Sequence, residues 1–214
     1  MNSPKEMMNS ILILLLCALF SSTSHAVLQN FCKADLRLQQ TPTGYPCLPS
    51  ESVTADDFKS SFNGKPGIPV PTNAVLYPAA VQNFPIVNGG RISGGLVELA
   101  PGGSLPLHTH GANEILIVFS GRMDVGLLTP RRAYQNTLGP RDFTYFPEGM
   151  QHYLINSGPG KAVAFAAYSS DGPPFNFLHL TLFSNNVSSP ILSDVSFIGE
   201  PDIRKNKARF NGTG

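Results

Sequence analysis

The sequence predicts an all-β protein whose strands form one sandwich or barrel. Its 214 residues include 20 glycines and 19 prolines, with 42% hydrophobic and only 14% charged residues. This mixture favours turns and short strands over coiled coils or charged disordered chain. No segment between residues 75 and 183 keeps a helical period for three turns. A chain of this length can form a single larger all-β domain.

Short apolar segments recur along the middle of the chain, each bounded by glycine, proline, asparagine or serine, which is typical of a sandwich or barrel. We expect strands at residues 92–99, 105–110, 114–120, 123–128, 143–146, 152–155, 163–168 and 177–183. Several of them, including 114–120 and 177–183, are apolar on both faces, whereas a strand that faces water on one side alternates. We therefore expect a neighbouring element or another subunit to cover the second face, which favours an oligomer.

Residues 1–26 have the pattern of a cleaved secretory signal. Lys5 precedes an apolar run, Ile11–Phe20, and Ser24-His25-Ala26 forms a small-x-small cleavage site. The run is too short to span a bilayer, although an uncleaved anchor is the alternative. We expect no membrane span in the mature protein. Cleavage would also remove Cys17.

Two cysteines, Cys32 and Cys47, would remain after cleavage, and in a secreted chain they predict a disulfide. A metal site for this pair is the weaker alternative, because no histidine lies nearby. The disulfide would pin an N-terminal arm at residues 27–57. Within this arm, Thr54 and Asp57 have capping-box spacing, which predicts a short helix or turn. Residues 64–71 are expected to form a loop, because prolines and glycines dominate them.

Residues 190–214 differ from the strand-rich segment and predict short helices. We expect one helix to start at Ser193-Asp194 and end at Gly199, and another to run from Pro201 to about residue 210. Asn186 and Asn211 each begin a glycosylation sequon. The net charge is only +1 and the basic residues at 204–209 form a short cluster, so we expect no nucleic-acid partner.

The candidate functional residues centre on His108 and His110. On a strand these side chains point to the same face, about 6.6 Å apart. Glu114 has the same parity, but straight extension would place it roughly 13 Å beyond His110. We therefore expect a hairpin bend that returns Glu114 to the histidines, and Gly111 is placed to permit it.

A third imidazole could come from His152, which follows the tight turn Pro147-Glu148-Gly149. Three imidazoles and a carboxylate suit a divalent first-row metal, and the absence of thiolates favours Mn or Fe, with Zn, Cu and Ni as alternatives. Four protein ligands would leave positions open on an octahedral ion, as in a catalytic site. His179 lies among leucines and is expected to be a packed histidine instead.

At these residues the sequence resembles the cupin superfamily, and within it the plant germin-like proteins. The first cupin motif is matched by Gly102, His108, His110, Glu114 and Gly121. The second motif is matched by Pro147, Gly149, His152 and Asn156, although Arg141 stands where that motif opens with glycine. The paired cysteines and the segments 56–58 and 84–88 extend the resemblance over most of the mature chain.

The resemblance implies a single cupin jelly-roll β-barrel at residues 58–189, with residues 190–214 as a helical tail. It implies manganese held by His108, His110, Glu114 and His152, with Fe, Zn or Cu as alternatives. It also implies secretion to the apoplast or cell wall, and homo-oligomers that include hexamers. Family members include oxalate oxidases, superoxide dismutases, nucleotide-sugar phosphodiesterases and auxin-binding proteins.

One residue separates these activities. Oxalate-oxidising germins resemble PGGTNPPH before the first histidine, and their asparagine is thought to hold oxalate, whereas this chain has Leu105 there. Leucine offers no donor to a doubly charged substrate, although Asn88 could supply the family's other asparagine. We therefore rank superoxide dismutase first and oxalate oxidase third. The second hypothesis is a cell-wall or receptor-like module without turnover, in which the metal is structural or holds an auxin-type small carboxylate. Leu116, Val118 and Phe165 are then expected in the apolar interior that takes the ligand.

Overall fold

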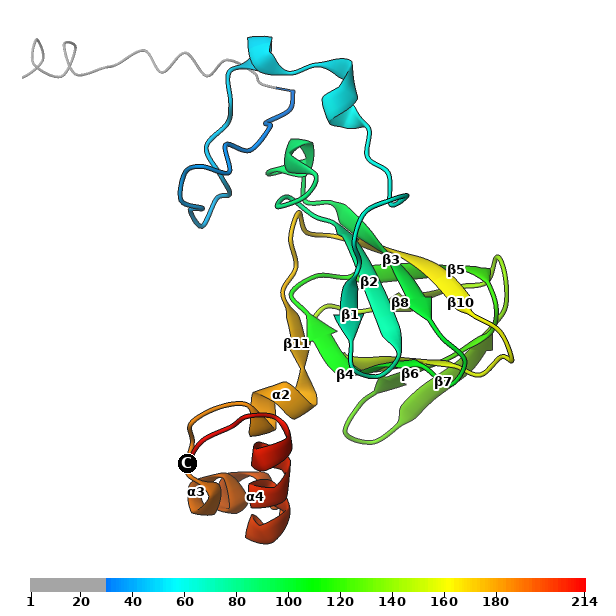
Figure 1. Ribbon diagram of the computed structural model, residues 1–214, viewed down its shortest axis with the longest axis vertical. Coiled ribbons are helices and arrows are strands. Elements are labelled where there is room, and N and C mark those ends of the chain that lie inside the picture. The colour runs from blue at the N-terminus through cyan, green and yellow to red at the C-terminus, as the bar shows by residue number, and fades with distance from the viewer. Residues whose placement is uncertain (1–29) are drawn as a thin grey trace, which may run out of the picture. The chain divides into compact units, whose positions relative to one another are not determined.

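The computed structural model describes residues 30–214 (Figure 1). The predicted signal segment, with Cys17 and His25, lies outside the described residues. Two antiparallel sheets pack face to face, and short helices follow them at the C-terminus, so the predicted all-β fold class is confirmed. The six-stranded sheet has the order β1 (Ile68–Val70), β2 (Ala74–Ala79), β3 (Ser93–Leu99), β10 (Ala162–Tyr168), β5 (Glu114–Ser120) and β8 (Phe143–Phe146). The five-stranded sheet has the order β11 (Phe175–Phe177), β4 (Ser104–His110), β9 (Gln151–Asn156), β6 (Met123–Leu128) and β7 (Ala133–Leu138).

The chain changes sheet repeatedly, as in a jelly roll. β3 lies in the six-stranded sheet, β4 in the five-stranded sheet and β5 in the six-stranded sheet again. The segment between His110 and Glu114 is therefore a crossing between facing sheets, and the expected hairpin bend was wrong. Gly111 does not adopt a left-handed conformation, so the crossing does not depend on a glycine there.

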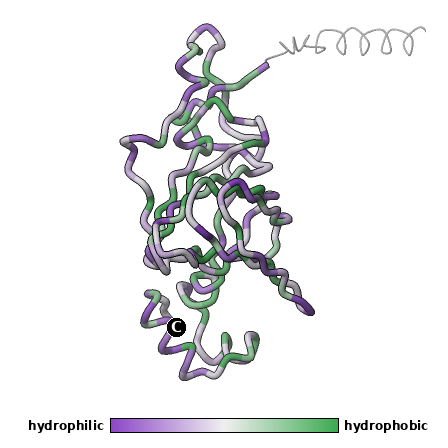
Figure 2. Tube along the Cα trace, turned by 90° about the vertical axis from the view of Figure 1, so that its right-hand side faces the viewer, coloured by the Kyte–Doolittle hydropathy of each residue, from purple (hydrophilic) through white to green (hydrophobic). Residues whose placement is uncertain are grey.

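The core lies between the sheets and is built from alternate residues of each strand. In β5, Leu116 and Val118 are completely buried, whereas Ile115 and Phe119 are more than half exposed on the other face. Figure 2 shows hydrophobic and hydrophilic residues alternating along the trace. Phe165 was expected in the interior but lies on the outer face of its sheet, where its ring stacks on Phe119. Strand parity places it there, because Ala164 and Ala166 take the inward positions.

Four strands differ from the sequence predictions. Residues 177–183 were expected to be one strand, but β11 ends at Phe177 and the helix α2 (Leu178–Phe183) follows. Phe183 of α2 is buried with Leu192 and Ile203 of the next two helices, and tertiary packing of this kind decides between strand and helix for a short apolar run. β1, β2 and β7 were not expected. β1 contains Pro69 and lies at a sheet edge, where proline is tolerated.

The C-terminal helices form a small core of their own. α3 (Ser189–Ser196) begins with Pro190 in its first turn and ends at Phe197, which is left-handed, so the predicted bounds of this helix were wrong. Gly199 instead precedes α4 (Glu200–Arg209), whose early Pro201 and end near residue 210 confirm the second predicted helix. None of the helices between residues 30 and 214 is long and apolar enough to cross a membrane.

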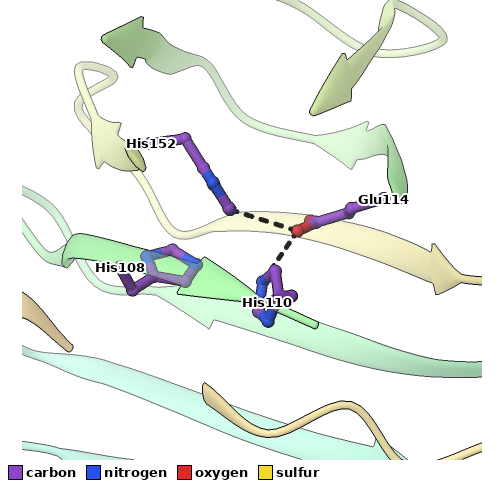
Figure 3. Close-up of side chains that lie close together, drawn as sticks. All are labelled: His108, His110, Glu114 and His152. Carbon is purple, nitrogen blue, oxygen red and sulfur yellow. Dashed lines mark ion pairs between the residues drawn. The ribbon is translucent and has the colours of Figure 1, made fainter. Parts of the chain in front are cut away.

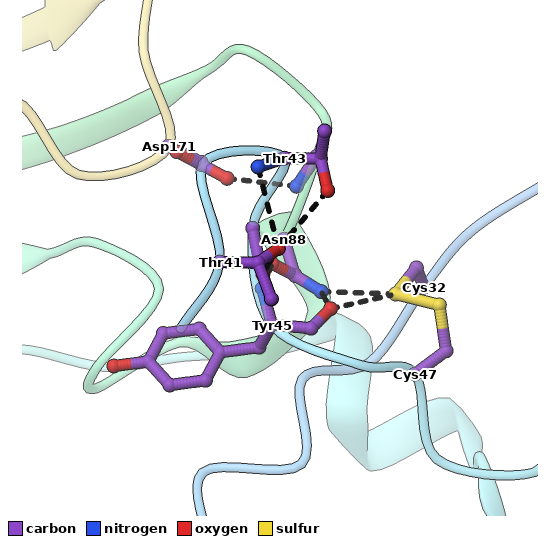
Figure 4. The surroundings of a disulfide bond; sticks show 9 residues. Cys32, Thr41, Thr43, Tyr45, Cys47, Asn88 and Asp171 are labelled. Carbon is purple, nitrogen blue, oxygen red and sulfur yellow. Dashed lines mark hydrogen bonds between the residues drawn. A yellow bond between two sulfur atoms is a disulfide. The ribbon is translucent and has the colours of Figure 1, made fainter. Parts of the chain in front are cut away.

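The arm that precedes the strands contains the predicted disulfide between Cys32 and Cys47 (Figure 4). Two short 3-10 helices follow at residues 50–52 and 55–58, and a third lies at 85–87. The backbone amide of Thr54 donates to Asp57 Oδ2 over 2.8 Å, which confirms the predicted capping interaction. These contacts give the arm local structure where it contains no regular strand.

Candidate metal centre

Three strands bring His108, His110, Glu114 and His152 together between the two sheets (Figure 3). β4 carries the first two histidines at alternate positions, β9 places His152 directly opposite His108, and Glu114 begins β5 on the facing sheet. All four side chains are buried, and their candidate ligand atoms lie within 4.8 Å of one another. The structure thus gathers all four residues that the sequence predicted as ligands.

Backbone contacts connect the two motifs that supply these residues. The amide of Gly149, in the turn before β9, donates to the carbonyl of His110 over 2.9 Å. Asn113, directly before Glu114, accepts hydrogen bonds from the Tyr145 hydroxyl and the Glu148 amide through its side-chain oxygen. The segment that leads to Glu114 is therefore fixed at His110 and at Asn113 by residues of the second motif and of β8. Sequence reasoning did not identify Asn113, whose only signal is its position next to a candidate ligand.

Two of the imidazoles are oriented by backbone carbonyls. Nδ1 of His108 lies 2.7 Å from the carbonyl oxygen of Pro106, and Nδ1 of His152 lies 2.8 Å from that of Met150. A carbonyl only accepts hydrogen bonds, so both Nδ1 atoms carry a proton, and in the neutral form of each ring the lone pair is then on Nε2. This arrangement is typical of histidines that bind a metal through Nε2.

The carboxylate interacts closely with two of the imidazoles. Glu114 Oε2 lies 2.9 Å from His110 Nε2 and 3.3 Å from His152 Nε2. Burial alone would raise the pKa of Glu114, but the close approach of these two imidazoles outweighs it and lowers the pKa to about 2. Burial, followed by the charges of His152 and His110, lowers the pKa of His108 to about 3. The cluster therefore favours an ionised carboxylate and a neutral His108, which are the forms that bind metals.

Several polar atoms of the cluster lack hydrogen-bond partners within residues 30–214. They are both ring nitrogens of His110, Oε2 of Glu114 and Nε2 of His152. The short distances above are close approaches without the angles of a hydrogen bond. Buried polar atoms without partners are costly, and a cation at their centre would satisfy three of them together. The residues present therefore fit a bound divalent metal.

Aromatic rings enclose the imidazoles. Phe146 stacks on His152 with ring centroids 4.2 Å apart, and Phe175 contacts His110 at the same distance and also stacks on His108. The buried Tyr168 lies 5.0 Å from the His110 ring. Sequence reasoning missed these roles because Phe175 and Tyr168 are far from both motifs in the chain. Only the strand order places them here.

The remaining site predictions have different surroundings. Leu105 is 2% exposed and belongs to the hydrophobic core. Asn88 was considered a substrate residue, but its side-chain amide binds the N-terminal arm (Figure 4). Its Oδ1 accepts a hydrogen bond from the Tyr45 amide, and its Nδ2 donates to the Tyr45 carbonyl and lies 2.9 Å from Cys32 Sγ. His179 is outside the cluster and packs on Phe177 and Phe210.

Comparisons with known proteins agree with this geometry. Residues 63–196 match the model of the cupin family. A germin-like protein of Arabidopsis thaliana, subfamily 3 member 1, is 37% identical over 94% of this chain and 98% of its own length. The chain belongs to the germin-like proteins of the cupin family.

Other relatives of this germin-like protein have diverse described activities. An auxin-binding protein of Prunus persica is 37% identical over 91% of this chain and 95% of its own length. Among solved structures, an oxalate oxidase superposes with a TM-score of 0.79 at 28% identity, covering 86% of this chain and 96% of that one. The family and fold are thus shown, and the His/Glu cluster is a site that could hold a metal.

Proposed function

We propose that this protein is a secreted manganese-dependent superoxide dismutase, which converts superoxide to hydrogen peroxide and oxygen. The observation that carries the proposal is the buried cluster of three imidazoles and one carboxylate. A bound manganese ion would supply a one-electron couple that alternately oxidises and reduces superoxide. Imidazole and carboxylate ligands without thiolate favour this metal.

The residues of the chain would hold the ion and control its surroundings. His108, His110, His152 and Glu114 would be the ligands, with one negative charge between them. A divalent ion would therefore leave the site with a net positive charge, which attracts a small anion. The phenylalanine rings packed on the imidazoles limit water around them.

The position before the first histidine argues against oxalate as the substrate. Leu105 lies in β4 opposite Leu154 and is buried in the core, so it presents no donor to a dicarboxylate. Superoxide is smaller and needs only an open position on the metal. We therefore keep oxalate oxidase as the third possibility for this site.

The second candidate function is binding of an auxin-type small carboxylate without turnover. An apolar pocket lined by Phe175 and Tyr168, which also pack on the imidazoles, favours it. In this case the metal would hold the carboxylate, and the pocket would take the apolar body of the ligand. Saturable binding that requires the metal, without redox turnover, would favour this alternative.

The test is a comparison of His110→Ala with His179→Ala. Replacing His110 should remove bound manganese, measured by elemental analysis, and superoxide dismutase activity should fall to the level of metal-free protein. His179 lies outside the cluster, so its replacement should preserve both. Dismutase activity that survives in His110→Ala would contradict the proposal, and hydrogen peroxide release from oxalate would favour oxalate oxidase.

We also propose secretion to the apoplast or cell wall, glycosylation and homo-oligomerisation. The disulfide fits an oxidising compartment, and the predicted signal segment fits export. Asn186 and Asn211 are both exposed and could carry glycans. The exposed apolar face of β5 and β8 supports self-association, for which hexamers are the family expectation.

A further inference from the structure

A pocket of about 520 Å³ lies where the edges of the two sheets face each other. β1, β2 and β3 form one wall, and β11 with the segment before it forms the other. This volume is within the usual range for small-molecule sites. The side chains that give the pocket its apolar character are Ile68, Leu76, Val97, Pro174, Phe175 and Phe177.

Two residues that carry hydroxyl groups are neighbours in the wall of this pocket. Ser93 of β3 and Tyr168 of β10 are direct cross-strand partners, so their side chains point to the same face of the sheet. The Ser93 hydroxyl is buried and has no hydrogen-bond partner among residues 30–214. No hydrogen bond joins the Tyr168 phenol to another residue of the described chain either. A buried hydroxyl without a partner is costly, so a ligand oxygen here would supply the hydrogen-bond partner that the Ser93 hydroxyl lacks.

The pocket has no means to neutralise a charged ligand. No lysine, arginine or histidine lines it. A carboxylate in this pocket would therefore lose its hydration without gaining a counter-ion. An uncharged molecule would suffer no such penalty.

We propose that this pocket binds an uncharged, largely apolar small molecule whose single hydroxyl or carbonyl oxygen is held by Ser93 and Tyr168. The aromatic and aliphatic lining would enclose the body of the ligand, and the two hydroxyl groups would fix its orientation. This inference goes beyond the proposed dismutase function and does not depend on it, because none of the pocket's polar partners is a candidate metal ligand.

Such a ligand would lie close to the metal centre without binding the metal. Phe175 and Tyr168 line the pocket and also pack on His110. Binding should therefore occur in both metal-free and manganese-loaded protein. This property distinguishes the inference from carboxylate binding at the metal, which requires the ion.

The experiment is calorimetric titration with 1-naphthol and 1-naphthoate, which share a ring system but differ in charge at neutral pH. We expect 1-naphthol to bind metal-free and manganese-loaded protein with similar affinity. For metal-free protein, 1-naphthoate should bind at least about tenfold more weakly, because its buried charge would be uncompensated. Equal affinity of the metal-free protein for the two compounds, or no binding of 1-naphthol, would overturn the proposal.

Three variants identify the hydroxyl pair. Ser93→Ala and Tyr168→Phe should each weaken 1-naphthol binding roughly threefold to tenfold, as expected for the loss of one neutral hydrogen bond. Tyr153→Phe removes a phenol that is bonded to Gln135, away from the pocket, and should leave binding unchanged. If neither pocket variant weakens binding, the assigned role of the two hydroxyl groups is wrong.

A stability measurement separates this role from a structural one. The Ser93 hydroxyl has no partner, so Ser93→Ala should keep or raise the denaturation midpoint while it weakens binding. Sedimentation at each titration concentration tests the competing occupant, a segment of a second copy. If 1-naphthol binds only when the protein is diluted to monomers, the pocket is a subunit interface and the proposal fails.

Discussion

Arg141 adopts a backbone conformation that usually requires glycine. Its φ is 76°, in the left-handed region, and it stands where the second cupin motif opens with glycine. Side chains with a Cβ are strained there by about 1–2 kcal/mol. The motif glycines Gly102, Gly121 and Gly149 have positive φ as well, so their positions are explained by backbone geometry. The missing glycine therefore affects a turn and leaves the candidate ligands in place.

Replacing Arg141 with glycine should stabilise the protein. We expect Arg141→Gly to raise the free energy of unfolding by about 1 kcal/mol, because relief of strain exceeds the added entropy of the unfolded chain. Urea denaturation would measure the change. Arg131 is also in a turn region but has no positive φ, so Arg131→Gly should destabilise slightly. A loss of stability in Arg141→Gly equal to that control would contradict the strain argument.

The buried His108 should make the metal-free protein sensitive to acid. Its pKa is lowered to about 3 from 6.5, so the unfolded chain binds a proton near pH 6 that the folded chain does not. Protonation of His108 in the unfolded chain therefore lowers the free energy of unfolding as the pH falls from 6.5 toward 3, and it has no effect above pH 6.5. Glu114, whose pKa is lowered from 4.5, adds a loss in the same direction only below pH 4.5.

Urea denaturation of metal-free protein at pH 7 and 4.5 would measure this effect. We expect the unfolding free energy to fall by roughly 3 kcal/mol from His108 alone. His108→Gln should remove most of the difference. His179→Gln, which changes a more exposed ring, should keep most of it. An unchanged pH dependence in His108→Gln would show that other groups control acid stability.

At the scale of elements, the strand that carries His152, β9, is anchored by Asn156 at its end. Its buried side-chain amide donates to the carbonyls of Leu99, Ala100 and Gly160, and its oxygen accepts from the Gly158 amide. These bonds join β9 to the end of β3 on the facing sheet. The last residue of the second motif thus holds the two sheets together, at the end of the strand that begins next to the site.

Loss of this anchor should destabilise the whole sandwich. Asn156→Ala would leave buried carbonyls without donors, and we expect a cost of about 2–3 kcal/mol in unfolding free energy. Thermal denaturation of the metal-free protein would measure it. Asn136→Ala, at an exposed position of β7, is the matched control and should change stability little. Equal effects of the two replacements would contradict the anchoring role.

At the scale of the whole molecule, one outer face is apolar and exposed in the single chain. Phe143 is 70% exposed, and Ile115, Phe119 and Tyr145 are each more than half exposed on the same pair of strands. The expectation that both faces of β5 are covered is therefore not met within one chain. Exposed apolar patches of this kind usually mark an interaction surface.

Charge introduced into this patch should disrupt self-association. We expect wild-type protein to sediment as an oligomer and Phe143→Glu to shift toward monomer, because burying a carboxylate without a partner is costly. Tyr134→Glu, an exposed aromatic residue on β7, is the control and should leave the assembly unchanged. Wild-type protein that sediments as a monomer at all concentrations would contradict the prediction.

The sequence alone was sufficient for the features that depend on local pattern. Short apolar segments bounded by turn-forming residues predicted most of the strands, two cysteines predicted the disulfide, and residue spacing predicted which side chains would gather. His108 and His110 needed only strand parity to share a face. Their surroundings could not be predicted in this way.

Tertiary structure decided what depends on contacts between distant segments. Glu114 reaches the histidines from the facing sheet, Tyr168 and Phe175 enclose them from β10 and β11, and residues 178–183 form a helix because Phe183 packs against later helices. Strand parity shows which way a side chain points, but it does not show which strands will face each other. The order of strands in the two sheets therefore decided how the four candidate ligands meet and what surrounds them.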